Sequence, residues 1–224
     1  MGDLGKIHQL IIPFFGHDIT LNLEVILMTW IVFAILFALG FLTVRKKGLY
    51  PKAMQMFGEF YVGQFYGLTE DALDRKMAKT YGPLICALFM FLVLSNWLGI
   101  LPHLEEPTKD LNTPLSLGIM GFFIAHYAGI RSKGFKAYAS EYFQPMFFMM
   151  PLNVIGELAK IVSISFRLFG NIMGGSIIIL VVSHLTYSFV LPPILNAFFG
   201  LFVGTIQAFV FTMLTVVYIS VQVK

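Results

Sequence analysis

Arg167 is the only charged residue in the most apolar part of this sequence. No Asp, Glu, Lys or Arg occurs from Leu168 to Val223, and the nearest charges before Arg167 are Lys160 and Glu157. An arginine inside a bilayer costs from about 2.5 to more than 10 kcal/mol, so such residues are usually functional. A guanidinium stays protonated at every accessible pH. The chemistry that this position offers is therefore a permanent positive charge, which attracts anions and repels cations.

The residues that share a helical face with Arg167 are small or polar. They are Lys160, Ser163, Asn171 and Gly174, and Gly170 and Gly175 lie beside them. Small residues let a second helix approach closely within a membrane. This face therefore predicts a contact with another helix, which belongs either to this chain or to another polypeptide.

The sequence does not place a carboxylate next to Arg167. Glu157 is ten residues away, which is about 15 Å along a helix. A desolvated arginine normally pairs with carboxylates or with backbone oxygens. We therefore expect another polypeptide to bring the negative charge; the alternative is an arginine satisfied by carbonyl groups of this chain, Gln207 and water.

The composition indicates that these residues fold in lipid. Hydrophobic residues make up 58% of the chain and charged residues 12%, and the mean hydropathy is +0.81. A soluble domain carries about twice that charge, and a helix crosses a membrane with ~20 apolar residues. We predict an all-α multi-span membrane protein, with residues 1–224 as a single membrane domain. About five membrane-embedded helices are expected at 23–44, 84–101, 115–130, 151–185 and 194–221.

An amphipathic surface helix is expected at 51–75, where apolar residues recur at spacings of three and four. It lies on the membrane surface or packs on its own protein, and the two are compatible. If this helix does not cross the membrane, the basic clusters at 45–47 and 131–133 lie on the same side of the membrane. The positive-inside rule makes that side cytoplasmic. The acidic loop 102–114 and the N-terminus then lie outside, and the C-terminus is cytoplasmic. The first twenty residues do not fit a signal peptide.

The last two predicted helices exceed the length of an upright span, so they are expected to form a strongly tilted hairpin. If their turn centres near Tyr187, Arg167 and Gln207 stand at about the same depth on facing helices. Cys86, the only cysteine, lies in an apolar run and is expected to serve packing.

Residues 163–171, Ser-Ile-Ser-Phe-Arg-Leu-Phe-Gly-Asn, closely resemble the signature of subunit a of F-type ATP synthases. The resemblance covers nearly the whole chain. Further matching positions are Asn96-Trp97, Pro102, 110–113, Pro151, Asn153, Glu157, Lys160, 207–211 and 218–219.

The resemblance implies a non-catalytic stator subunit that packs against a rotating ring of c subunits, each with an ion-binding carboxylate. Two aqueous half-channels would lead H⁺ or Na⁺ to and from those carboxylates, separated by Arg167. The implied ion-translocation residues are Arg167, Gln207 and Asn171, with Gln207 holding the guanidinium.

Channel-lining candidates are Glu157 and Ser163 on the cytoplasmic side, and Asn96, Ser176 and the external loop on the outer side. The implied partners are the c ring, the b-subunit peripheral stalk, the other ATP synthase subunits and lipid, in a bacterial plasma membrane. No cofactor, metal site or catalytic residue is expected.

The sequence departs from that family at three positions. Ser176 and Gly200 stand near positions where many proton-driven relatives carry Glu or His, and Gly99 stands where some relatives carry an acid, so the outer path is expected to lack the usual acids. His184 is eight residues past Ser176 and could substitute, or it could be a hydrogen-bonded core residue. A path of Ser, Asn, Thr and water favours Na⁺ as the coupling ion, with H⁺ as the alternative.

The main rival function is a stand-alone multi-span transporter in which Arg167 binds an anionic substrate. That class predicts broken helices and paired buried charges within one chain, and the sequence has no second buried charge. An intramembrane enzyme is disfavoured because the sequence has neither a His-Glu-x-x-His nor a Gly-x-Ser-x-Gly motif. Nucleic acid is excluded as a partner because no basic face exists.

Overall fold

The computed structural model describes residues 9–14, 17–44, 53–101, 104–141, 150–186 and 191–224. Within them, five helical segments are long and apolar enough to cross a membrane: Leu23–Thr43, Arg75–Leu98, Asn112–Lys133, Met150–Leu185 and Leu191–Val223. The all-α multi-span fold class is confirmed, and each segment overlaps one of the five predicted spans.

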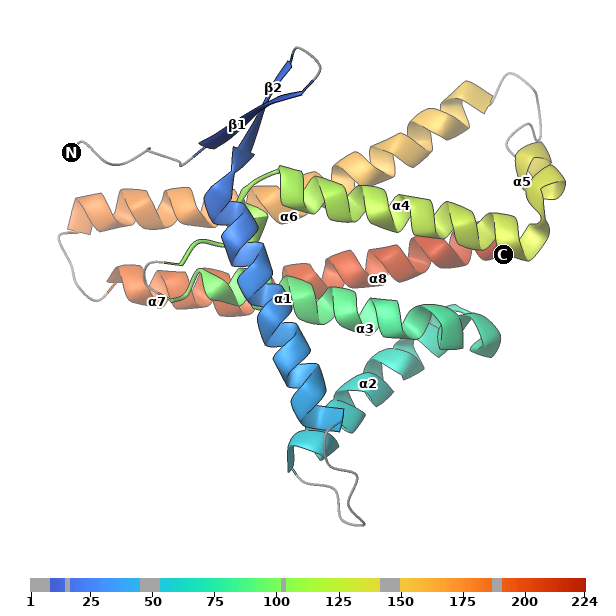
Figure 1. Ribbon diagram of the computed structural model, residues 1–224, viewed down its shortest axis with the longest axis horizontal. Coiled ribbons are helices and arrows are strands. Elements are labelled where there is room, and N and C mark those ends of the chain that lie inside the picture. The colour runs from blue at the N-terminus through green and yellow to red at the C-terminus, as the bar shows by residue number, and fades with distance from the viewer. Residues whose placement is uncertain (1–8, 15–16, 45–52, 102–103, 142–149, 187–190) are drawn as a thin grey trace.

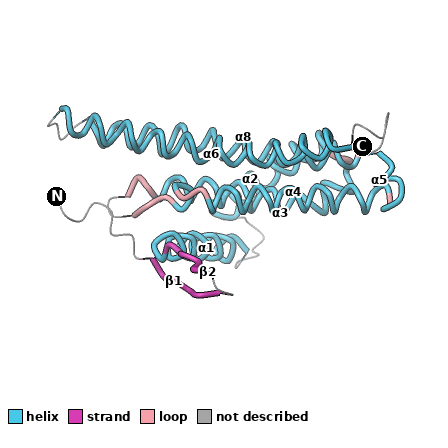
Figure 2. The backbone as a smooth tube through the Cα atoms, turned by 90° about the horizontal axis from the view of Figure 1, so that it is seen from above, coloured by secondary structure: helices cyan, strands magenta, loops and turns pink. Residues whose placement is uncertain are grey.

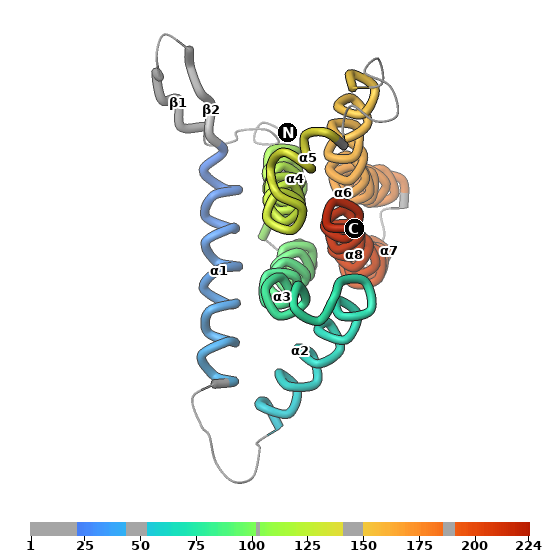
Figure 3. The backbone as a smooth tube through the Cα atoms, turned by 90° about the vertical axis from the view of Figure 1, so that its right-hand side faces the viewer, coloured from blue at the N-terminus to red at the C-terminus, as the bar shows by residue number. Residues whose placement is uncertain are grey.

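The helices fall into three layers, as Figure 2 shows. Helix α1 (Leu23–Val44) forms one layer, α3 (Arg75–Leu98) and α4 (Asn112–Lys133) form the middle layer, and α6 (Met150–Thr186) and α8 (Gly204–Val223) form the third. Helix α1 crosses the other long helices at a steep angle (Figures 1 and 3). The middle pair lies along α6 and α8 (Figures 1 and 2).

Helix α3 begins earlier than predicted, at Arg75 instead of Leu84. The sequence indicated a later start because the first turns of α3 are polar and Pro83 follows them. The structure instead contains Pro83 within the helix. The prediction was wrong because hydropathy marks the apolar part of a helix and not the polar turns that extend it.

The last predicted helix is divided into α7 (Leu191–Ala197), a π-helical segment η3 (Phe198–Val203) and α8. A π turn widens a helix locally and often occurs at functional sites. The predicted turn near Tyr187 lies outside the described residues. Helix α6 runs antiparallel to these three segments, so the predicted long hairpin is present (Figure 1).

Helix α2 (Ala53–Ala72) corresponds to the predicted amphipathic helix. Its C-terminal half packs on α3, where Phe65 is buried and the Tyr61 hydroxyl donates to the Cys86 carbonyl at 2.6 Å. Its N-terminal half leaves Phe57 and Phe60 exposed. Packing on its own protein is therefore established for half of this helix. Cys86 is buried, as expected.

The sequence did not predict the N-terminal β-hairpin. Strands β1 (Gln9–Phe14) and β2 (His17–Asn22) pair antiparallel, with Gln9 opposite Asn22 and Phe14 opposite His17. The available signal was two residues between short segments that contain isoleucine and leucine. Helix α5 (Phe135–Glu141) and the 3₁₀ turn η1 (Pro107–Lys109) complete the described elements.

The core forms where α3, α6 and α8 meet and where α4 and α2 cover them. Leu92, Leu168 and Phe211 are fully or almost fully buried in the first region, and Ile85 and Ile219 in the second. Most apolar side chains of α1 remain exposed, as expected for a helix that faces lipid.

Candidate functional site: a solitary arginine between two cavities

Arg167 lies on the outward face of α6, one turn from Ser163 and Asn171, and all three residues are exposed. Among the described residues, no side chain or carbonyl forms a hydrogen bond or ion pair with its guanidinium; the described ion pairs are Arg75–Glu70, Lys109–Glu105 and Lys160–Glu157. The described part of the chain thus leaves the Arg167 charge without a counter-charge.

The glycines beside Arg167 border open space. A Cβ atom built on Gly170 or Gly174 would meet nothing within 4 Å, whereas one on Gly175 would meet the Phe199 ring at 3.0 Å. Gly175 therefore serves packing against η3. Gly170 and Gly174, in contrast, leave a bare surface next to Arg167, and the described residues of this chain do not fill it.

Gln207 is placed at the level of Asn171, one helical turn from Arg167. The Asn171 Nδ2 donates to Gln207 Oε1 at 2.8 Å and so joins α6 to α8. The hydrogen bond expected between Gln207 and Arg167 is not formed, because Gln207 is buried between the helices while Arg167 points outward. Gln207 is 4% exposed, and its Nε2 has no hydrogen-bond partner among the described residues.

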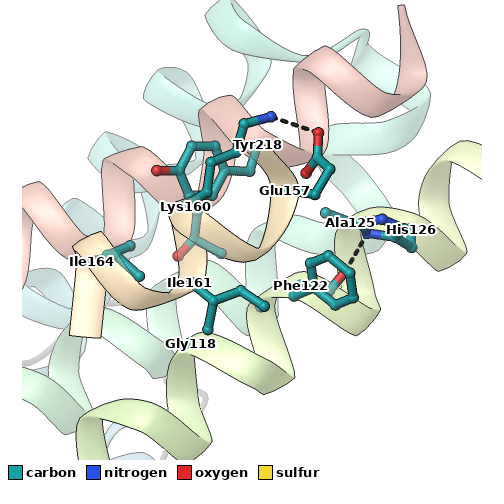
Figure 4. A pocket seen from close by; sticks show the side chains of 11 residues that line it. Gly118, Phe122, Ala125, His126, Glu157, Lys160, Ile161, Ile164 and Tyr218 are labelled. Carbon is teal, nitrogen blue, oxygen red and sulfur yellow. Dashed lines mark hydrogen bonds and ion pairs between the residues drawn. The ribbon is translucent and has the colours of Figure 1, made fainter. Parts of the chain in front are cut away.

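A first cavity, called the Glu157 cavity here, lies toward the N-terminal end of α6. It has about 20 Å³ of free space, enough for one water molecule. Figure 4 shows Glu157 and Lys160 paired at its edge, with the Tyr218 ring from α8 beside Lys160. The Lys160 Nζ lies 2.6 Å from Glu157 Oε1 and 5.6 Å from the centre of the Tyr218 ring.

The Glu157 cavity adjoins an open groove of about 290 Å³ at the end of α6 and α8, which Asn153, Glu157, Lys160 and Gln222 line. Glu157 lines both spaces, whereas Ser163 lines neither. Sequence reasoning missed His126 of α4, which also lines the cavity and donates from Nδ1 to the Phe122 carbonyl oxygen at 3.0 Å (Figure 4).

A second cavity, called the Ser176 cavity here, lies on the other side of Arg167 along α6. It also has about 20 Å³ of free space. Its polar lining comes from α3, α6, α7, α8 and the loop before η1: Asn96, Glu106, Asn171, Ser176, Asn196 and Gln207. The cavity thus brings together Asn171, Gln207, Asn96 and Ser176, four of the predicted site residues. His184 is exposed and does not line it.

Asn96 lines the Ser176 cavity but also joins three elements. Its Nδ2 donates to the Gly204 carbonyl and its Oδ1 accepts from the Thr108 hydroxyl, each at 2.8 Å. A Cβ on Gly204 would lie 2.9 Å from the Asn96 Cβ. Glycine at 204 therefore lets α3 and α8 approach closely enough for this bond.

Glu106 is the cavity residue that the sequence did not single out. Its side chain lies over Gly99, where any Cβ would collide with its carboxyl group. The pKa of this carboxyl is raised to about 7, chiefly by burial; Lys109 opposes the rise and Glu105 adds to it. The positions of the usual acids are occupied by Gly99, Ser176 and Gly200, and the external loop instead supplies Glu106 to this cavity. Sequence reasoning counted the loop as channel-lining but could not tell which of its acids turns inward.

Comparison with known proteins identifies the family of this chain. The family model described as ATP synthase A chain matches residues 26–220. The chain belongs to this family. The chain is 39% identical to ATP synthase subunit a of Moorella thermoacetica over 193 residues, which cover 86% of this chain and 87% of that protein.

Other members of the family match over an even larger share of their length. Subunit a of Priestia megaterium is 34% identical over 228 residues, and that of Bacillus subtilis is 33% identical over 236; each alignment covers 95% of this chain and 96% of the relative. The chain is therefore an integral, multi-pass membrane protein of the ATP synthase subunit a family, as the motif at 163–171 predicted.

Proposed function

We propose that this chain is the ion-translocating stator subunit a of an F-type ATP synthase, and that Arg167 faces the carboxylates of a c-subunit ring. The observation that carries this proposal is the position of Arg167. It is an exposed cation on a glycine-lined face, without a described counter-charge, between two small cavities that α6 and α8 line together with neighbouring elements.

The two cavities would belong to two half-channels. The Ser176 cavity opens the path on the side of the acidic loop, and the Glu157 cavity opens the path on the side of Arg131 and Lys133. The positive-inside rule makes this second side cytoplasmic, so the N-terminus would lie outside and Lys224 inside. A fixed guanidinium between the cavities repels a cation that would otherwise pass directly from one to the other.

The same charge would drive exchange at the ring. A guanidinium next to a carboxylate favours the ionised form of that carboxylate, so a ring site releases its ion into one half-channel as it reaches Arg167. The emptied site passes Arg167 and binds an ion from the other half-channel before it turns into lipid. One charge that crosses 100 mV supplies about 2.3 kcal/mol. In this cycle the chain breaks no covalent bond.

The remaining partners follow from this role. The open, glycine-bearing groove on α2, lined by Gly58, Gly63, Gly67 and Glu70, leaves room for a helix of another stator subunit such as subunit b. We place the complex in a bacterial plasma membrane. The Na⁺ preference inferred from the sequence depended on a path without the usual acids, and an inward-turned Glu106 weakens that argument.

The test is the Arg167→Ala variant in the complete complex, reconstituted in vesicles. We expect gradient-driven ATP synthesis to be lost while the soluble ATPase head still hydrolyses ATP. The matched control is Arg75→Ala, which removes an arginine whose side chain is 81% exposed at the start of α3. Full synthesis in Arg167→Ala would overturn the proposal, and so would equal losses in both variants.

A further inference from the structure

Glu106 is the titratable residue of the Ser176 cavity, and it enters from outside the helix pair that carries Arg167 and Gln207. It lies in the loop between α3 and η1, immediately before the buried residues Pro107 and Thr108. The Thr108 hydroxyl bonds to Asn96, which anchors this loop to α3 and α8. The position of Glu106 over the cavity is therefore fixed by buried contacts on its C-terminal side.

The residues packed around Glu106 leave space for its carboxyl group. Gly99 has no side chain, and the Glu106 carboxyl occupies the space that any other residue at position 99 would fill. Asn196 of α7 donates to the Gly99 carbonyl oxygen at 3.1 Å and closes the same region. The described residues leave both Glu106 oxygens without a hydrogen-bond donor, so they can bond to water in the cavity.

The charges that act on Glu106 come from its own loop. Lys109 and Glu105 are the charged neighbours, and they pair with each other at 3.7 Å. Among the described residues, the polar groups that the helices contribute to the cavity lining are neutral: Asn96 from α3, Asn171 and Ser176 from α6, Asn196 from α7 and Gln207 from α8. His103 lies on the same loop but outside the described residues. A largely desolvated carboxyl without a strong cationic partner is easily protonated.

A second observation concerns the Gln207 amide, which lies between the cavity and the Arg167 region. Gln207 is 4% exposed, and its Nε2 has no partner among the described residues, although it lines the same cavity. A buried amide donor of this kind is normally satisfied by ordered water. Water held there would stand between Glu106 and Asn171, which is one turn from Arg167.

We propose that Glu106 is the proton relay of the Ser176 cavity, and that the coupling ion of this chain is H⁺. This inference rests on the proposed function. The Glu106 carboxylate takes a proton from a hydronium ion that enters from the loop side, which leaves a neutral carboxylic acid and a water molecule. The acid then gives that proton, through water bonded to Gln207, to an ionised ring carboxylate. Glu106 is thereby ionised again, and no other bond changes.

The direct test compares Glu106→Gln with Glu105→Gln in vesicles that contain the complete complex. Both changes remove one carboxyl group from the same loop, but Glu105 is exposed. We expect Glu106→Gln to lower ATP-driven proton pumping and passive proton flow by about 100-fold, the usual scale for loss of a proton-transfer group. Glu105→Gln should behave like the wild type, and Glu106→Asp should recover part of the flow with a pH profile shifted downward.

Additional variants distinguish a failure of the proposed function from a failure of the relay alone. Arg167→Ala is assayed in parallel: if it stays coupled, the proposed function itself fails. If Arg167→Ala is uncoupled but Glu106→Gln pumps at the wild-type rate, only the relay fails. Equal losses in Glu106→Gln and Glu106→Asp, without a change in the pH profile, would make Glu106 structural and overturn the relay. Loss of flow in His103→Gln with Glu106→Gln unaffected would assign the relay to His103. Synthesis that requires Na⁺ and survives a protonophore would overturn H⁺ as the ion.

Discussion

Asn171 of α6 and Gln207 of α8 form a hydrogen bond of 2.8 Å that joins the two helices one turn beyond Arg167. Gln207 is buried and Arg167 is exposed. The amide pair thus joins α6 to α8 one turn from Arg167, while no described residue bonds the guanidinium on the same face of α6. This arrangement keeps Arg167 available to a partner instead of neutralising it within the chain.

The Asn171–Gln207 bond predicts a non-additive pair of substitutions. Asn171→Leu and Gln207→Leu should each lower the free energy of unfolding by about 1 kcal/mol, because each removes the same hydrogen bond within the membrane. The double variant should lose scarcely more than one single variant. Thermal unfolding of the purified chain in detergent, analysed as a double-mutant cycle, measures this coupling.

The control for that cycle uses a distant bond of α8. Tyr138 donates its hydroxyl to Gln222 Oε1 at 2.8 Å, and Tyr138→Phe combined with Gln207→Leu should give additive losses. Additive losses for Asn171→Leu and Gln207→Leu as well would mean that the two amides do not act as a pair.

The glycine face predicts an effect on assembly without an effect on folding. Gly170→Leu fills open space, so the isolated chain should insert and fold normally, and leucine should even favour the helix. Docking of the ring should weaken, since overpacking at an interface costs about 1–3 kcal/mol, or about 10- to 100-fold in affinity. The c-subunit content of the purified complex is the measurement.

Gly40 of α1 is the matched control because a Cβ built there also meets nothing within 4 Å. Gly40→Leu should leave the c-subunit content unchanged. Normal ring content in Gly170→Leu would show that the face beside Arg167 contacts lipid and not the ring.

Glu106 predicts how stability depends on pH. Its pKa is about 7 in the folded chain, against an ordinary value of 4.5. The folded state therefore binds more protons than the unfolded state between these values, and the free energy of unfolding should fall as pH rises through this window. Thermal unfolding of the wild type from pH 4 to pH 8 should show the decline, whereas Glu106→Gln should flatten the curve. An unchanged slope in Glu106→Gln, or an equal change in Glu105→Gln, would contradict the assigned pKa.

The sequence predicted the parts of this molecule that local physical chemistry determines. Apolar runs of sufficient length defined the five membrane helices, and the lone charge at Arg167 marked the site because burial of an unpaired cation is unfavourable. The motif around it identified the family. Helical spacing also placed Asn171 and Ser163 on the Arg167 face without any knowledge of the neighbouring helices.

What the sequence could not predict depends on contacts between distant segments. Glu105 and Glu106 are adjacent acids, and only the packing of Thr108 on Asn96 and the bare backbone at Gly99 turn Glu106 inward. His184 is exposed and lies outside the Ser176 cavity, which its spacing from Ser176 could not reveal. The β-hairpin was missed because a short strand pair has only a weak local signal.

The most direct test of the central claim is a high-resolution cryo-electron microscopy map of the intact complex around Arg167. The account predicts a ring helix against Gly170 and Gly174, and a ring carboxylate as the acidic group within about 4 Å of the guanidinium. A guanidinium paired with an acid of its own chain, on a face covered by lipid, would contradict it.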